Sequence, residues 1–329
     1  MRKGKRQSLH AGAFLAWPSS MPSVAASMPT PPLLVVLDIA TLGARAAYQA
    51  FAAAVHRRFA AARFRPKVRF ITADADETGK NVEALKEALL AARADIILAA
   101  NSTFARMAGK FGLGKPILFF SLADRIENGL TDSLTRPGMG MTGFTLGAAS
   151  NLKRQEMLLR LAPRCRILGR LSSSAHRVEG LRQPSAGLAV LARGIEERKF
   201  DCDSLEQLPV LLKSRAAREV DAWAIEYTFV ASRYPEEIVR QFGMLRRPMT
   251  YPRMKHVHLG GIAAFEPSIE EADDAWVSQV ASLLAGVPIA DIPVVQATRY
   301  KFGLNFKTCW QVGVDPPKSL IKIADLVIE

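Results

Sequence analysis

The chain has 329 residues, of which 49% are hydrophobic and 23% are charged, and this balance excludes a disordered protein and a long coiled coil. The length is about twice that of a common domain and predicts two lobes. The formal net charge is +13, but Lys and Arg are spread along the sequence and four of them lie within residues 2–6. This distribution does not predict nucleic-acid binding, which needs cations gathered on one face or tail.

The first 30 residues have the three-part layout of a secretory signal. A basic run, Arg2–Arg6, precedes a short apolar stretch, Ala11–Trp17, and Val24-x-Ala26 offers a cleavage pattern. A disordered cytoplasmic tail is the alternative. The leader contains no cysteine that a lipid could modify, and no stretch of the chain approaches the roughly 18–20 apolar residues of a membrane-spanning helix. We therefore expect an exported protein that is free in solution.

From Pro32 onward, short apolar strands alternate with helical segments. A helix is predicted over 44–61, and Val82, Leu85, Leu89 and Leu90 mark one face of a second helix. The predicted strands are Leu33–Leu37, Val68–Thr72, Ile96–Ala99 and Pro116–Phe120. Fully apolar strands in this order indicate a parallel sheet that helices cover on both faces.

The same alternation then restarts and predicts a second lobe. Helices are expected over 151–161, with Ser150 as its N-cap, and over 185–198, and strands are expected at Ile167–Leu171 and Ala222–Tyr227. The last third adds a helix over 272–284 and strand-like segments at Val257–Leu259 and Arg299–Asn305. The predicted fold class is α/β, with two doubly wound parallel-sheet lobes that a multi-strand hinge joins.

Ligands of open parallel sheets bind beyond the carboxyl ends of the strands. The polar and aromatic residues that follow the predicted strands are Asp38, Asn101, Ser102, Thr103, Ser121, Asp124, Ser172, Ser173, Ser174, Glu226, Tyr227 and Thr228. These side chains suit a small polar molecule. Ser, Thr, Asn and Asp are also common helix caps, so each of them has a structural alternative.

Two glycine motifs fail their structural context. Gly109-x4-Gly114-Lys115 matches a phosphate-binding loop, but Pro116 replaces the hydroxyl residue and a strand follows. Gly138-x-Gly140-x-x-Gly143 matches a dinucleotide fingerprint, but it also leads into a predicted strand. His256 and His258 alternate on a predicted strand without a third metal ligand, and Cys165, Cys202 and Cys309 form no motif. We expect no catalytic residues, no metal and no cofactor.

The sequence resembles a family of ABC transporter substrate-binding proteins that includes tryptophan- and tyrosine-type uptake proteins. Thr135–Gly138 and Met141–Phe144 are similar to the family's "RPGGNVTG" turn, and the following helix continues the match through Lys153-Arg154 and Pro163. The C-terminal matches are Pro293-Val294, Gln296, Thr298, Asn305–Thr308, Pro316-Pro317 and Ala324–Glu329.

The resemblance implies the type I periplasmic-binding fold and a soluble periplasmic monomer that works with an ABC permease. It implies a leader over 1–30, an N-terminal lobe over 31–145 plus 262–297, and a C-terminal lobe over 146–261 plus 298–329. Chain crossings are expected near 142–147, 260–265 and 297–301. Such proteins trap a small-molecule ligand between the lobes by hinge closure.

The cleft segments depart from the family pattern. Glu226–Phe229 stands where many members have Asp-Pro, and Gly260–Glu266 replaces a common "GGLMSYG". We expect an amino-acid-like or small aromatic ligand, with Asp38, Asp124 or Glu226 for an ammonium, hydroxyls for a carboxylate, and Tyr227 or Phe265 for a ring. A sensory binding protein and a small-molecule enzyme on the same fold are the alternatives.

Overall fold

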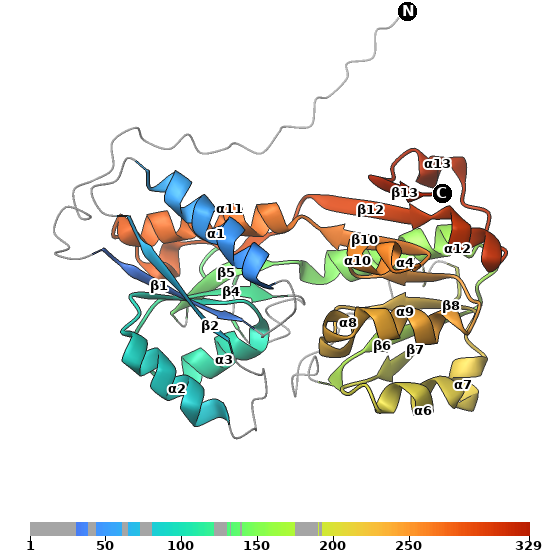
Figure 1. The fold of residues 1–329 in the computed structure, drawn as a ribbon, viewed down its shortest axis with the longest axis horizontal. Helices are drawn as coiled ribbons and strands as arrows, with labels where there is room; N and C mark the ends of the chain where they lie inside the picture. The colour runs from blue at the N-terminus through green and yellow to red at the C-terminus, as the bar shows by residue number, and fades with distance from the viewer. Residues whose placement is uncertain are drawn as a thin grey trace, which may run out of the picture.

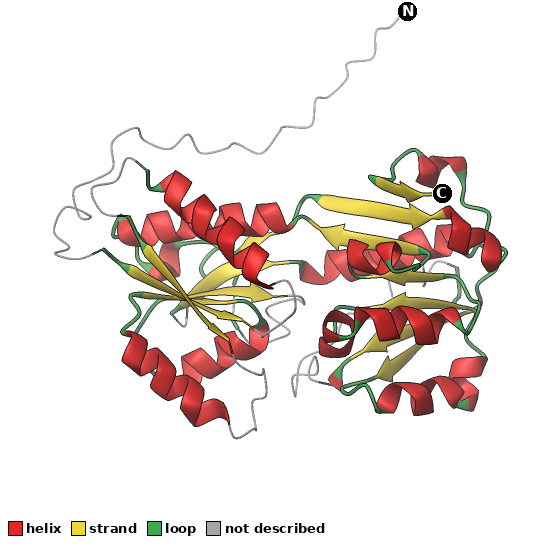
Figure 2. Ribbon diagram, in the orientation of Figure 1, coloured by secondary structure: helices red, strands yellow, loops and turns green. Residues whose placement is uncertain are grey.

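The structure is a computed structural model that describes residues 31–38, 44–60, 65–72, 81–121, 130–131, 133–138, 140–174, 190 and 193–329. Two α/β lobes lie side by side and are joined at one side by three chain crossings (Figure 1). Each lobe contains one sheet with helices on both of its faces (Figure 2). The predicted fold class is confirmed.

The first sheet has six strands in the order β11-β5-β4-β3-β1-β2, and every neighbouring pair is parallel. The strands are β1 (Leu33–Asp38), β2 (Lys67–Thr72), β3 (Ile96–Ala99), β4 (Ile117–Ser121), β5 (Met141–Thr145) and β11 (Val295–Gln296). The helical elements of this lobe are α1 (Ala44–Arg58), α2 (Asn81–Ala92), α3 (Ser102–Lys110), α11 (Ile269–Leu284) and the 3₁₀ turn η3 (Ile289–Asp291).

The second sheet has seven strands in the order β13-β12-β10-β9-β8-β6-β7. The strands are β6 (Ile167–Ser172), β7 (Glu196–Asp201), β8 (Ala222–Ile225), β9 (Met249–Tyr251), β10 (Ala263–Pro267), β12 (Tyr300–Asn305) and β13 (Leu326–Ile328). β12 is antiparallel to β10, and the other pairs are parallel. The helices are α4 (Gly147–Leu161), α6 (Gln207–Lys213), α7 (Arg215–Arg218), α8 (Phe229–Arg233), α9 (Pro235–Gly243), α10 (Met254–His258), α12 (Phe306–Gln311) and α13 (Lys318–Ile321).

Alternating side chains of the strands fill two cores in each lobe, because successive residues point to opposite faces of a sheet. Leu34 and Val36 of β1 pack in one cluster with Phe51 of α1, whereas Val35 packs in the cluster of Leu89 of α2. In the second lobe, Trp223 is completely buried in the cluster of α9, and its neighbours in β8 face α4. This two-sided burial explains why the strands read as continuous apolar runs.

Three crossings connect the lobes. Each of them joins the edge of the first sheet where β5 and β11 end to the edge of the second sheet where β10 ends. β5 ends at Thr145 and α4 of the second lobe begins at Gly147; β10 ends at Pro267 and α11 of the first lobe begins at Ile269. The third crossing runs from β11 to β12 over 297–299. The second crossing lies later than the predicted segment 260–265, because Ala263–Pro267 pairs with β9 and β12 in the second sheet.

Several local predictions were wrong. Residues 257–259 form no strand, since His256 and His258 belong to α10. Ser150 lies inside α4 and does not cap it, because the helix begins three residues earlier. The helix predicted up to Arg198 is replaced at its end by β7, and residues 185–189 and 191–192 of its range lie outside the described residues.

Candidate functional site

The carboxyl-terminal edges of the two sheets face each other. The first crossing leaves the carboxyl end of β5, and the second leaves the carboxyl end of β10. The third starts at the carboxyl end of β11 and enters β12 at Tyr300, which pairs with Pro267 at the same edge of the second sheet. The polar residues that end the strands of both lobes therefore lie at sheet edges that face each other, as the strand directions show (Figure 1).

At the first edge, the ends of β3 and β4 bring hydroxyl groups together. The Ser102 and Ser121 Oγ atoms are 3.1 Å apart, and Ser121 is completely buried. Asn101 caps α3, because its Oδ1 accepts a hydrogen bond from the Phe104 N–H at 2.8 Å. Its Nδ2 is buried and has no hydrogen-bond partner among the described residues. Thr103 accepts a 3.3 Å hydrogen bond from Arg106 Nη2.

At the second edge, β6 ends in three serines. Ser172 is 1% exposed, and Ser173 and Ser174 donate hydrogen bonds to the two carboxylate oxygens of Asp203, at 2.6 and 2.5 Å. Asp203 follows β7 and was not predicted as a site residue, because the polar sequence of β7 does not predict a strand before it. The carboxylate fixes the loop after β6 at this edge.

Glu226, at the end of β8, belongs to a buried ion network. Its Oε1 lies 3.2 Å from Arg170 Nε, and Arg170 Nη1 lies 3.3 Å from Glu197 Oε1. Burial raises the pKa of Glu197 against the lowering effect of Arg170, and the charge of Glu226 raises it further. The predicted role of Glu226 toward an ammonium therefore competes with an internal cation.

Tyr227 and Phe265 lie beside the crossings. Tyr227 packs in one buried cluster with Phe144 of the first lobe and with Leu146 of the first crossing, so its ring joins the two lobes. Phe265 stacks on Tyr300, with ring centroids 4.9 Å apart and an interplanar angle of 18°. Both predicted aromatic residues therefore line the hinge, each with only 8% of its surface exposed.

Arg154 of α4 lies in the same region and was not predicted. It is 1% exposed, and its guanidinium lies 5.4 Å from the centroid of the Tyr227 ring. Nη1 donates to Asn151 Oδ1 at 2.6 Å and Nη2 to the Phe265 carbonyl at 3.4 Å, whereas Nε has no partner among the described residues. Burial lowers the pKa of Arg154, opposed by the nearby Tyr227 and Glu226.

The family model for ABC transporter substrate-binding proteins matches residues 65–328. The chain belongs to this family. No curated protein has a significantly similar sequence.

Solved structures share the fold at low sequence identity. An ABC domain from Streptococcus pneumonia in complex with L-Trp has a TM-score of 0.75 and 20% identity, covering 91% of this chain and 100% of its own. A conserved domain protein from Vibrio cholerae has a TM-score of 0.76 and 16% identity, with the same coverage. A ligand-free, open substrate-binding protein from Clostridium difficile has a TM-score of 0.60 and 16% identity, covering 90% of this chain and 99% of its own.

For two predicted site residues of this substrate-binding protein, the structure describes no side chain. Asp124 lies outside the described residues, and Asp38 is placed only as the last residue of β1. His256 is buried and its ring nitrogens lie 3.1 Å from the carbonyls of Arg253 and Ala231, whereas His258 is exposed. Within the described ranges, no three His, Cys, Asp or Glu side chains group as a metal site.

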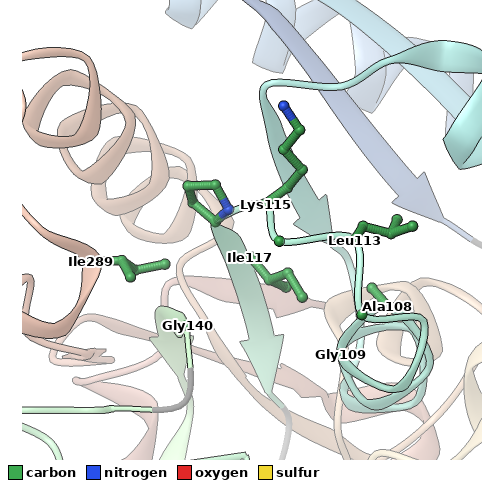
Figure 3. Close-up of a pocket in the computed structure, with 10 residues that line it drawn as sticks. Ala108, Gly109, Leu113, Lys115, Ile117, Gly140 and Ile289 are labelled. Carbon is green, nitrogen blue, oxygen red and sulfur yellow. The ribbon is translucent and has the colours of Figure 1, made fainter.

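A pocket of about 320 Å³ lies at the opposite, amino-terminal edge of the first sheet (Figure 3). Gly109, Gly114 and Lys115 of the first glycine motif line it together with Gly140 of the second. Strands β4 and β5 follow these motifs, as predicted, so no helix begins where a phosphate would lie.

In the described part of the substrate-binding protein, no helix is long and apolar enough to cross a membrane.

Proposed function

We propose that this substrate-binding protein is the extracytoplasmic component of an ABC importer and is not an enzyme. It captures an amino-acid-like or small aromatic ligand between the carboxyl edges of its two sheets, closes about the three crossings and presents the closed form to a permease. The observation that carries the proposal is the convergence of both carboxyl edges at the crossings, with buried hydroxyls on each side. Closure follows if the ligand binds the closed form more tightly than the open form.

The side chains at the two edges support a zwitterionic ligand with an apolar part. Ser102, Ser121 and the free Nδ2 of Asn101 offer hydrogen bonds from the first lobe. Arg154 forms no ion pair within the described part of the chain, and its free Nε suits a carboxylate. The stacked rings of Phe265 and Tyr300 supply an apolar wall. The L-Trp in the pneumococcal relative is consistent with such a ligand.

The lobe limits follow from the crossings. We propose that residues 31–145 and 268–297 form the N-terminal lobe and that residues 146–267 and 298–329 form the C-terminal lobe, with residues 1–30 as an export signal. The protein then acts as a soluble periplasmic monomer. A ligand bound between the lobes contacts both of them, so binding requires residues of both edges.

A thermal unfolding panel tests this function. The full chain is heated with each standard amino acid and with aromatic carboxylic acids, and a ligand at about 100 times its Kd raises the unfolding free energy by about 2.7 kcal/mol. We expect one chemical class to raise the melting temperature, and Ser102→Ala in one lobe and Ser172→Ala in the other to remove that shift. Ser278→Ala, on the exposed side of α11, is the matched control and keeps it.

If the ligand-induced shift in melting temperature is lost in only one of the two variants, Ser102→Ala or Ser172→Ala, binding between the lobes is contradicted. Turnover of any compound in the panel contradicts the assignment as a binding protein.

A further inference from the structure

Arginine side chains gather at the amino-terminal edge of the second sheet, opposite the edge that carries Ser172. Exposed arginines precede each of the four neighbouring parallel strands β9, β8, β6 and β7. They are Arg164, Arg166, Arg193, Arg218, Arg246 and Arg247. We name this set the arginine edge. The cations that are spread along the sequence are therefore brought together by the fold.

Hydrogen bonds between the starting segments show that these arginines are neighbours. The Arg166 carbonyl accepts from the Glu196 N–H at 2.9 Å, and the Arg166 N–H donates to Asp221 Oδ2 at 2.9 Å. The Trp223 N–H donates to the carbonyl of Pro248, which directly follows Arg247. Arg166 and Arg247 thus stand on strands separated by one other, with backbones about 10 Å apart.

The carboxylates of Asp221 and Glu219, which lie at this edge, already have hydrogen-bond or ion-pair partners. Asp221 accepts hydrogen bonds from the backbone of Arg166 and Ile167. Glu219 pairs with Arg198 at 2.7 Å and with Arg215 at 3.1 Å. Arg166, Arg246 and Arg247 form no ion pair with any carboxylate that the structure describes, so the edge keeps a positive excess.

Large apolar side chains stand exposed at the same edge. Met244 is 65% exposed just ahead of Arg246, and Trp310 of α12 is 70% exposed. α12 belongs to this edge because it follows β12, which runs antiparallel to β10, and the Thr308 hydroxyl donates to the Gly260 carbonyl at 2.8 Å. Trp223 and Trp276 are buried, so Trp310 differs from them.

We propose that the arginine edge, with Met244 and Trp310, binds the surface of an anionic phospholipid bilayer. Clustered guanidinium groups attract anionic headgroups over about a Debye length. Exposed Trp and Met side chains gain by entering the headgroup region, where tryptophan is enriched. The phosphates of a nucleic acid would also attract the arginines, but they would leave the apolar side chain of Met244 exposed to water. The contact would keep the protein at the membrane with the carboxyl edges turned away.

Vesicle cosedimentation tests the proposal with the full chain. We expect binding to vesicles of phosphatidylglycerol and phosphatidylcholine, little binding to phosphatidylcholine alone, and release at high salt. The triple variant Arg166→Glu, Arg246→Glu and Arg247→Glu should weaken binding at least tenfold. Residues 1–30 are kept in every variant, so the basic leader contributes equally.

The matched control reverses three exposed cations of the first lobe by Arg65→Glu, Arg93→Glu and Lys115→Glu. It changes the net charge by the same amount, and we expect it to bind vesicles within about threefold of the unmodified chain. Equal weakening in both triple variants would show attraction by net charge alone and would overturn the proposal. Tight RNA binding without vesicle binding would overturn it as well.

Trp310 provides a second readout. In a Trp17→Phe background, vesicles should shift the tryptophan emission to shorter wavelength, and Trp310→Phe should remove that shift while the melting temperature stays unchanged. A shift that persists without Trp310 would contradict the proposed contact.

Discussion

The carboxylate of Glu271 accepts a hydrogen bond from the backbone N–H of Thr298 at 3.0 Å. Glu271 lies in the first turn of α11, just after the second crossing, and Thr298 lies in the third crossing. The same carboxylate accepts from the Arg299 N–H at 2.9 Å. Burial raises the pKa of Glu271, but a hydrogen bond from the Thr298 hydroxyl and the two backbone hydrogen bonds outweigh it and lower the pKa. The two crossings are therefore joined by one ionised side chain.

Glu271→Gln should loosen the hinge. The amide keeps the shape of the side chain but is a weaker acceptor than a carboxylate, so we expect a loss of roughly 1 kcal/mol in unfolding free energy. Hydrogen exchange of the Thr298 and Arg299 amides should become faster. The neighbouring Glu270→Gln, whose carboxylate contacts Ser268 and Lys301 side chains, serves as the control and should leave those amides unchanged. Unchanged exchange in the Glu271 variant would contradict the role given to this residue.

Gly143→Ala should destabilise the first lobe strongly. Gly143 has φ +154°, and an added Cβ would lie 2.0 Å from the Phe119 carbonyl oxygen of the neighbouring strand β4. Such a clash with backbone forces β4 and β5 apart, at roughly 3 kcal/mol. Gly140→Ala is the control, since its Cβ would meet nothing within 4 Å and only its φ of +69° is unfavourable. Urea unfolding measures both, and similar losses would argue against the close approach.

Stability should fall as the pH falls from about 6.5 to about 4 because of His256. Burial lowers its pKa from 6.5 to about 4, despite the carbonyls of Arg253 and Ala231. Within this window the unfolded chain binds a proton that the folded chain does not, so unfolding is favoured by on the order of 3 kcal/mol at the acid end. His256→Gln should reduce the pH dependence of the unfolding free energy. An identical pH profile in the variant would show that the folded and the unfolded chain bind the His256 proton over the same pH range, which would contradict the lowered pKa.

Strands such as β1, β3, β4 and β6 were predictable because burial on two faces makes them continuously apolar, whereas the short buried strands β9 and β10 were not predicted. β7 was missed for the opposite reason: it is an edge strand of the second sheet with the polar sequence Glu196–Asp201. The second crossing was placed too early because the family resemblance puts it near 260–265, whereas Ala263–Pro267 forms strand β10 of the second sheet. Nothing local in the sequence shows that Ala263 pairs with Leu304.

Only those site residues that directly follow a predicted strand could be predicted from the sequence. Ser102 and Ser121 were found in this way, and the structure brings them together. The sequence does mark Arg154, because it lies on the apolar face of α4 with Leu158 and Leu161, where burying a charge is costly. The pairing of Arg170 with Glu226 joins β6 to the end of β8, and it depends on strand order, which the sequence does not display.

The central claim is that ligand closes two lobes whose carboxyl edges face each other. The most direct measurement is the distance between spin labels on Glu87→Cys of α2 and Gln207→Cys of α6, two exposed positions on helices of different lobes that lie on the same side of the molecule (Figure 1). The three native cysteines are buried, which keeps labelling selective. With L-tryptophan, or with the compound that raises the melting temperature most, the label distance should shorten and its distribution should narrow. A distance that stays the same with saturating compound would contradict closure.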